Sequence, residues 1–125
     1  MRGLLPSGEM MIHSVYFWLV DELSDEQKAE FEGGMRRLFD IDVVASGRIG
    51  AAAGTPERPV TQNTFDYALF LEFESVADHN TYQDCDEHHV FVDAFSKWFK
   101  TVQVYDTEYG GLTATPLTPG VVINE

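Results

Sequence analysis

The chain has 125 residues, with 21 acidic side chains against eight basic ones and a formal net charge of −13. Its length is that of one domain with one hydrophobic core, and its 44% hydrophobic and 23% charged residues are typical of a folded globular protein. The charge argues against nucleic acid and anionic membrane surfaces as partners, because both require basic patches. The charge leaves a neutral or weakly charged organic molecule open as a small ligand, and solubility is the favoured explanation of the acidity.

The cysteine count and the hydropathy pattern bear on the compartment. Cys85 is the only cysteine, so no internal disulfide can form. No segment approaches the roughly 20 apolar residues of a membrane span. We therefore expect a cytoplasmic protein with a flexible leader at residues 1–10, one domain at residues 11–108 and an extended tail at residues 109–125.

The first strand is expected at residues 12–20, where β-branched and aromatic residues dominate. Alternation places His13 and Phe17 on one face of this strand. Tyr16 and Trp18 lie on the opposite face.

A helix is expected at residues 23–40. Ser24 and Gln27 form a capping box at its start. Gly33 and Gly34 are expected to let the helix approach the sheet closely. Its buried face follows the i, i+4, i+7, i+8 spacing of Phe31, Met35, Leu38 and Phe39.

The rest of the chain continues the alternation of strands and helices. Strands are expected at residues 43–54 and 64–74, then a short helix at 75–82, a longer helix at 87–99 and a strand at 101–109. The order β-α-β-β-α-β predicts an α+β, ferredoxin-like fold, in which helices cover one face of a four-stranded antiparallel sheet.

The other face of the sheet still carries large apolar side chains. In the predicted strands these are Ile12, Tyr16, Trp18, Phe70 and Tyr105. Phe65 is expected on the helix-covered face with Tyr67. An apolar patch of this size is abnormal for a monomer, so we expect a homodimer that packs sheet against sheet.

The segment TYQDCDEHHVFVDAF, residues 81–95, contains two adjacent histidines. His88 shares helical spacing with Phe91 and Phe95 and should point inward, whereas His89 should lie near the rim. The acids of this segment are expected to form the N-cap and first turn of the helix and to stabilise its dipole: Asp84, Asp86 and Glu87.

Metal binding and nucleophilic catalysis are the weaker interpretations of this segment. Cys85 and His88 are spaced i, i+3, and His13 could converge on them from the sheet. A zinc site needs three or four such ligands, however, and no second cysteine or His-x-x-x-His pair is present. We therefore expect no metal and no cofactor. The acids around Cys85 also disfavour the thiolate that a nucleophile requires.

Acid–base chemistry is the sharper alternative. An inward His88 could exchange a proton near neutral pH, and Tyr82 could turn its hydroxyl toward the same space. His13 and Tyr67 would add polar groups to a cavity walled by apolar residues, expected to be Phe17, Leu69, Phe91 and Phe95. From residue types alone, a packed core that satisfies these polar groups is the favoured interpretation.

Four segments in this order resemble the Dabb family, the stress-responsive dimeric α/β-barrel domain. They are MIHSVYFWLV, YALFLEFES, YQDCDEHHVFV and VQVYD. The resemblance covers residues 11–108. It implies a ferredoxin-like subunit, a barrel formed at a homodimer interface, and a cavity between sheet and helices.

Plant members of the family that are polyketide cyclases close a poly-β-keto chain without a cofactor, using a tyrosine and a histidine six residues apart. The resemblance assigns those roles to Tyr82 and His88 and matches the family's first-strand histidine to His13. Two features depart from the family pattern. Tyr67 stands where many members have histidine, and Cys85-Asp86 replaces the usual His-Pro.

Three functions follow as hypotheses. The first is a cofactor-free cyclase or lyase that acts on a hydrophobic, polyketide-like carbonyl compound through His88 and Tyr82. The second is a non-catalytic dimer that binds a small apolar molecule or serves a stress response. The third is a cofactor-independent monooxygenase.

Overall fold

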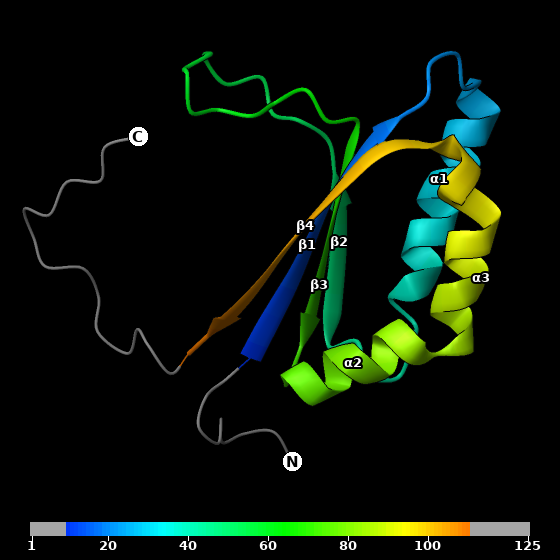
Figure 1. Ribbon diagram of the computed structural model, residues 1–125, viewed down its shortest axis with the longest axis vertical. Helices are drawn as coiled ribbons and strands as arrows, with labels where there is room; N and C mark the ends of the chain where they lie inside the picture. Colours follow the sequence, from blue (N-terminus) through cyan, green and yellow to red (C-terminus); the bar gives the residue numbers. More distant parts are fainter. Residues whose placement is uncertain (1–9, 111–125) are drawn as a thin grey trace, which may run out of the picture.

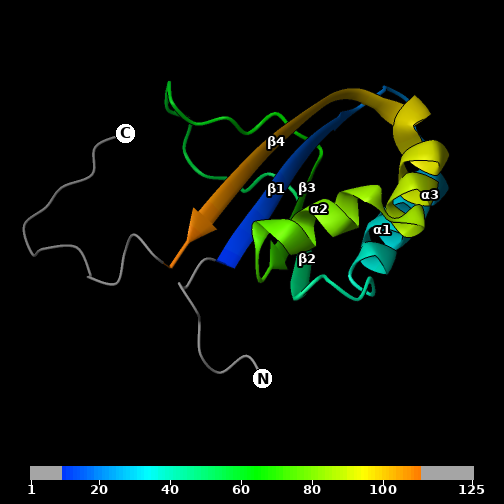
Figure 2. The same ribbon diagram turned by 60° about the horizontal axis from the view of Figure 1, so that its bottom comes forward.

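The computed structural model describes residues 10–110 and confirms the ferredoxin-like α+β fold. Its four antiparallel strands have the order β2-β3-β1-β4. The strands are β1 (Met10–Leu19), β2 (Ser46–Gly50), β3 (Tyr67–Phe73) and β4 (Phe99–Tyr109). The helices are α1 (Asp25–Leu38), α2 (Val76–Asp84) and α3 (Asp86–Phe95), followed by a 3₁₀ turn at Ser96–Trp98. All three α-helices lie on one face of the sheet (Figures 1 and 2).

Strand β1 occupies a central position because it pairs with β3 on one side and with β4 on the other. Its side chains alternate strictly between buried and half-buried, which confirms the predicted faces. His13 lies on the buried face, opposite Leu71 of β3 and Asp106 of β4. A polar side chain therefore stands in the middle of an otherwise apolar sheet surface.

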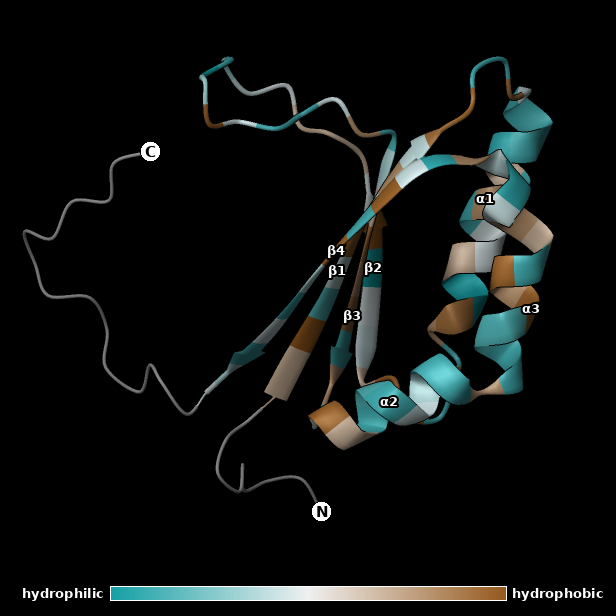
Figure 3. Ribbon diagram, viewed as in Figure 1, coloured by the Kyte–Doolittle hydropathy of each residue, from teal (hydrophilic) through white to brown (hydrophobic). Residues whose placement is uncertain are grey.

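Helix α1 begins with the predicted capping box, in which Ser24 and Gln27 bond to each other's backbone amides. The helix buries Phe31, Met35 and Leu38 against the sheet and α3. Helices α1 and α3 each combine hydrophobic and hydrophilic residues, as expected of helices that bury one stripe (Figure 3).

The two glycines of α1 behave differently from the prediction. The buried Gly34 packs against the ring of Phe95 on α3, not against the sheet. A Cβ atom at Gly34 would lie 2.3 Å from Cε2 of Phe95, whereas one at Gly33 would meet only Nη1 of Arg37, at 3.7 Å. The close approach that the glycine permits is therefore between helices α1 and α3.

Several predicted boundaries were wrong, for local reasons. Strand β2 is shorter than expected because residues 51–66 leave the sheet as a long loop. Phe65 therefore precedes β3, and its ring contacts Tyr16 and Trp18 on the uncovered face, not the helix side. Phe99 does not end a helix, because a 3₁₀ turn stops α3 early and Phe99 begins β4.

The junction of α2 and α3 also differs from the prediction. Asp84 is the last residue of α2 and does not cap α3. Cys85 is the N-cap residue of α3 and makes no side-chain capping bond, while Asp86 and Glu87 occupy the first turn as predicted. The backbone at Cys85 is extended, with φ −77° and ψ 158°, so the two helices have different directions.

The face of the sheet opposite the helices, here called the open sheet face, carries a cluster of aromatic rings. Tyr16 makes edge contacts with Phe65, Phe70 and Tyr105, and Trp18 makes one with Phe65. Tyr105 is 56% exposed. No described helix covers this cluster (Figures 1 and 2).

Within residues 10–110, no helix combines the length and the apolar character needed to cross a membrane. The predicted leader, apart from Met10, and nearly all of the predicted tail lie outside the described residues.

We predict that Gly34→Ala destabilises the protein. Alanine improves helix propensity by about 1 kcal/mol, but a clash with the buried ring of Phe95 costs about 1–3 kcal/mol. Gly33→Ala gains the same propensity without the clash and should stabilise the chain. Urea denaturation measures both variants, and a Gly34→Ala protein as stable as Gly33→Ala would contradict the close contact between the helices.

Candidate functional site

A cavity of about 240 Å³ lies between the sheet and helices α2 and α3. It is called here the histidine cavity. Its walls are largely apolar, and its polar side chains come from four elements that are far apart in the sequence. The lining residues are His13, Val15, Phe17, Leu69, His79, Tyr82, Gln83, His88, Phe91, Val92, Phe99, Val102, Val104 and Asp106.

His13 and Asp106 form the sheet side of the polar cluster. They are direct partners in the pairing of β1 with β4, and Nδ1 of His13 lies 2.5 Å from Oδ1 of Asp106. His13 is buried, whereas the side chain of Asp106 is 43% exposed. Burial lowers the pKa of His13, and the bond to Asp106 opposes this shift without cancelling it. His13 is therefore predominantly neutral at pH 7.

His79 and Tyr82 come from α2, where their i, i+3 spacing puts them on the same side of the helix. The His79 ring lies 4.8 Å from the His13 ring, centroid to centroid. Nδ1 of His79 lies 3.0 Å from Oδ1 of Asn80. Nε2 of His79 is buried and has no hydrogen-bond partner among residues 10–110.

Tyr82 is only 2% exposed, and its ring contacts those of His13 and His88. Burial raises the pKa of Tyr82, with the nearby Cys85 adding to the shift. The phenol therefore stays protonated at neutral pH. Burial and Cys85 account for that shift, with no hydrogen-bonded carboxylate among its causes, so the hydroxyl can donate a hydrogen bond to a ligand.

His88 enters the cavity from α3, and its ring centroid lies 4.8 Å from that of Tyr82. It is half-buried, whereas His89 is exposed, as the helical spacing predicted. Burial lowers the pKa of His88 and the neighbouring His89 lowers it further, while the backbone of Gln83 raises it. Nδ1 of His88 is also buried without a partner in the described range. His88 is thus a neutral imidazole with polar capacity to spare.

The break at Cys85 explains how Tyr82 and His88 meet. In one continuous helix, two residues six positions apart would point about 120° away from each other. The extended Cys85 separates α2 from α3 and turns both side chains toward the same cavity.

The structure gathers most of the site residues predicted from the sequence. The histidine cavity contains His13, Phe17, Leu69, Tyr82, His88 and Phe91. Tyr67 and Phe95 do not line it. The Tyr67 hydroxyl donates a 2.6 Å hydrogen bond to Glu32 of α1, and Tyr67 lines a different cavity. The ring of Phe95 packs over Gly34.

Three polar residues of the cavity were not named as site residues from the sequence: His79, Gln83 and Asp106. A signal was present for His79 and Asp106. His79 stands three residues before Tyr82, which is one helical turn, and Asp106 continues the alternation of Val102 and Val104 in β4. The helix–strand register that places them beside His13 could not be read from one sequence.

One ring nitrogen of His13, one of His79 and a carboxylate oxygen of Asp106 all lie within 4.8 Å of one another. Tyr82 and His88 complete the polar side of the cavity. Chemically, the arrangement offers a neutral base, a protonated phenol and a carboxylate–imidazole pair beside apolar walls.

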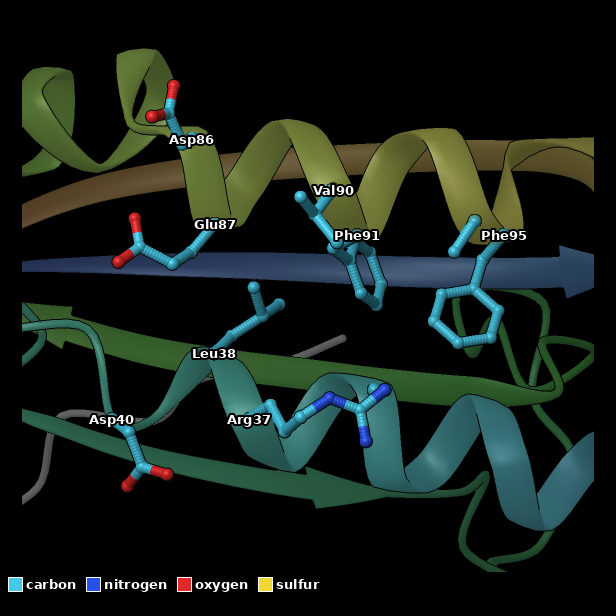
Figure 4. Close-up of a pocket in the computed structure, with 10 residues that line it drawn as sticks. Arg37, Leu38, Asp40, Asp86, Glu87, Val90, Phe91 and Phe95 are labelled. Carbon is cyan, nitrogen blue, oxygen red and sulfur yellow. The ribbon is translucent and has the colours of Figure 1, made fainter.

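A second cavity, of about 530 Å³, lies between α1 and α3 (Figure 4). Leu38, Phe91 and Phe95 form its apolar wall, and Arg37 and Glu87 are among its charged residues. None of the described residues that line it is a histidine, the side chain whose ordinary pKa lies nearest to neutral pH.

Comparison with solved structures supports the fold. A hydroxynitrile lyase from Passiflora edulis superposes with a TM-score of 0.72 at 18% identity, covering 87% of this chain and 99% of that chain. A dimeric ferredoxin-like protein of unknown function from Thermobifida fusca gives a TM-score of 0.67 at 14% identity, covering 82% and 92%. A candidate antibiotic biosynthesis monooxygenase from Nitrosomonas europaea gives 0.59 at 18% identity, covering 87% and 96%.

The search of curated proteins found no match to this chain. The model of the stress-responsive A/B barrel domain matches residues 11–109, which is most of the sequence. Together with the ferredoxin-like fold and the helix-covered sheet, this match shows that the chain belongs to the Dabb family, the stress-responsive A/B barrel domain.

Proposed function

We propose that the protein is an acid–base enzyme of the lyase or cyclase type that acts on a small hydrophobic carbonyl compound. His88 is the general base and Tyr82 the hydrogen-bond donor, and neither role needs a bound cofactor. The observation that carries the proposal is that the half-buried His88, whose buried Nδ1 has no partner among the described residues, has its ring centroid 4.8 Å from that of the buried Tyr82.

Unpaired buried polar groups are costly. Each costs about 1–3 kcal/mol when it is left without a hydrogen bond. A core selected for stability alone would give each of these groups a hydrogen-bond partner. Tyr67, elsewhere on the helix-covered face, has such a partner in Glu32. The unpaired groups of the histidine cavity are therefore best explained as groups that bind a ligand.

The proposed reaction follows from the protonation states. Neutral His88 removes the proton on the carbon next to a carbonyl, and the C–H electron pair moves onto the carbonyl oxygen as an enolate. Tyr82, protonated because burial raises its pKa, donates a hydrogen bond to that oxygen. The enolate carbon then attacks a second carbonyl, and the proton on His88 returns to the product alkoxide. In a lyase the same groups act in reverse.

The apolar walls fit the substrate class. Phe17, Leu69 and Phe91 would hold a hydrocarbon chain, and a net charge of −13 disfavours an anionic substrate. A hydroxynitrile lyase shares this fold at 18% identity, so the fold is compatible with lyase chemistry.

A non-catalytic binding protein is the second candidate, because the same apolar walls would hold a small molecule without turnover. A monooxygenase remains a third hypothesis. One structural neighbour bears that name, but no described residue selects this chemistry.

We predict that His88→Gln and Tyr82→Phe each lower kcat/KM about 10²- to 10⁴-fold. His88→Gln removes the base and Tyr82→Phe removes only a hydroxyl, and both keep the size of the side chain, so neither should unfold the chain. The assay is proton–deuterium exchange and cyclisation of a panel of β-dicarbonyl compounds, followed by NMR. His89→Gln, a neighbouring exposed histidine, is the matched control.

Wild-type rates in His88→Gln would refute the assignment of the base. Tight ligand binding by the wild type, with no exchange in any compound of the panel, would support the binding protein instead.

We predict that activity persists to lower pH than an ordinary histidine would allow. His88 works only as neutral imidazole, and its pKa lies below the usual 6.5 because of burial. As pH falls, kcat/KM should drop in a one-proton step whose midpoint lies below pH 6.5. The other titratable side chains near His88 are His13, His79, Tyr82, His89 and Asp106.

The same shift affects stability. Because the unfolded chain binds the proton first, the free energy of unfolding also falls below pH 6.5. Circular dichroism at each pH must therefore show folded protein. A loss of activity centred above pH 6.5 would contradict the role of His88.

We also propose that the chain forms a homodimer through the open sheet face. The exposed rings there are the reason, and the similar protein from Thermobifida fusca is dimeric. Tyr105→Glu should convert the dimer to a 14.1 kDa monomer in analytical ultracentrifugation, because a charge would be buried without a partner. Val90→Glu, on the exposed side of α3, is the control and should stay dimeric. A wild-type monomer at micromolar concentration would refute the dimer.

A further inference from the structure

We propose that His13, His79 and Asp106 bind a divalent transition-metal ion, with Zn²⁺ as the representative. The ion would link strand β4 to helix α2. It would lie on the side of the histidine cavity that faces solvent, where the exposed Asp106 is found. The proton transfer proposed for His88 and Tyr82 does not use this ion, so the two proposals stand or fall separately.

The first argument is geometric. Three potential ligand atoms, one from each residue, already lie within 4.8 Å of one another. Around a tetrahedral ion with bonds of about 2.0–2.2 Å, ligand atoms stand about 3.4 Å apart. Side-chain rotations of His79 and Asp106 would bring the ligand atoms to that spacing. Both side chains have room to rotate, because His79 is only half-buried and Asp106 lies on the edge strand β4. The buried His13 would remain in place.

The second argument comes from the hydrogen bonds of His79. Its Nδ1 lies against the side-chain oxygen of Asn80, at 3.0 Å, so Nδ1 carries the proton and Nε2 keeps its lone pair. That Nε2 is buried and without a partner among the described residues. An imidazole fixed in one tautomer by an outer hydrogen bond is the usual form of a metal-binding histidine.

The third argument is the chemical nature of the ligand set. Two imidazoles and one carboxylate select zinc and the neighbouring transition metals over Mg²⁺ and Ca²⁺, which prefer oxygen ligands alone. The ion would replace the proton that His13 and Asp106 share at 2.5 Å. The carboxylate would balance part of the charge of the ion, and the strongly acidic chain would attract it.

This cluster differs from the one considered in the sequence. Cys85 and His88 do not belong to it, because His88 is across Tyr82 from His13 and Cys85 caps α3. Helix α2 and strand β4 supply the two ligands that sequence spacing did not reveal.

The test is titration of Zn²⁺ alone into chelator-treated, full-length protein by isothermal calorimetry, with excess Mg²⁺ present to occupy surface acids. We expect one Zn²⁺ per chain and a rise in melting temperature. His79→Gln and Asp106→Asn should each weaken binding by at least about tenfold and lose the zinc-dependent rise. Each variant is compared with its own metal-free melting temperature, so a general loss of stability is not mistaken for loss of the site.

The controls remove the same chemical groups elsewhere. His89→Gln and Asp93→Asn change an exposed histidine and an exposed carboxylate on α3 and should bind Zn²⁺ as the wild type does. The visible spectrum of the Co²⁺ complex should show nitrogen and oxygen ligands and be lost in His79→Gln.

Absence of zinc binding in the wild type would overturn the proposal, as would equal affinity in all four variants, which would indicate binding to surface acids. Loss of binding in His89→Gln with retention in His79→Gln would place the ion elsewhere and would also overturn it. None of these outcomes depends on the proposed activity, because no substrate is present.

Discussion

The site depends on one local constraint, the extended backbone at Cys85. A continuous helix from residue 76 to residue 95 would direct Tyr82 and His88 to different sides. The break lets α3 pack along α1 while α2 crosses the end of the sheet where β1 begins (Figure 1). The close contact of Gly34 with Phe95 then holds α3 against α1. The histidine cavity is the space that these two different helix directions leave over β1 and β4.

The features that the sequence predicted correctly depend on residues close together in the chain, and those that it missed depend on residues far apart. The capping box at Ser24, the alternation in β1 and the inward position of His88 depend on residues a few positions apart, and all were predicted. Family resemblance carried the pairing of Tyr82 with His88, because the spacing of six residues gives no contact without the break between helices. The partnership of His13 with Asp106 spans 93 residues and depends on the register of two strands, which one sequence does not reveal. Tyr67 was wrongly predicted to line the histidine cavity, because its contact with Glu32 of α1 joins two residues that are far apart in the sequence.

The polar groups of the covered sheet face divide into two kinds. Tyr67 and Glu32 satisfy each other, as do His13 and Asp106, and these pairs are what a packed core requires. His79 and His88 each retain a buried nitrogen without a described partner, and they stand on either side of Tyr82. The packed-core interpretation therefore accounts for these two pairs but not for the buried nitrogens of His79 and His88. A protein that keeps such groups gives up stability at that place, as functional sites commonly do.

The charge of the protein connects the cavity with its surroundings. With 21 acids against eight bases, the field around the chain favours cations and neutral molecules over anions. Burial lowers the pKa of both His13 and His88, and an acidic partner, Asp106, opposes that shift at His13. Neutral imidazole is the form that accepts a proton from carbon and the form that ligates a metal, so desolvation by the apolar walls prepares both chemistries. Phe17, Leu69 and Phe91 thus act on the histidines as much as on any ligand, and a polar substitution among them would alter the chemistry of the cavity before it altered its shape.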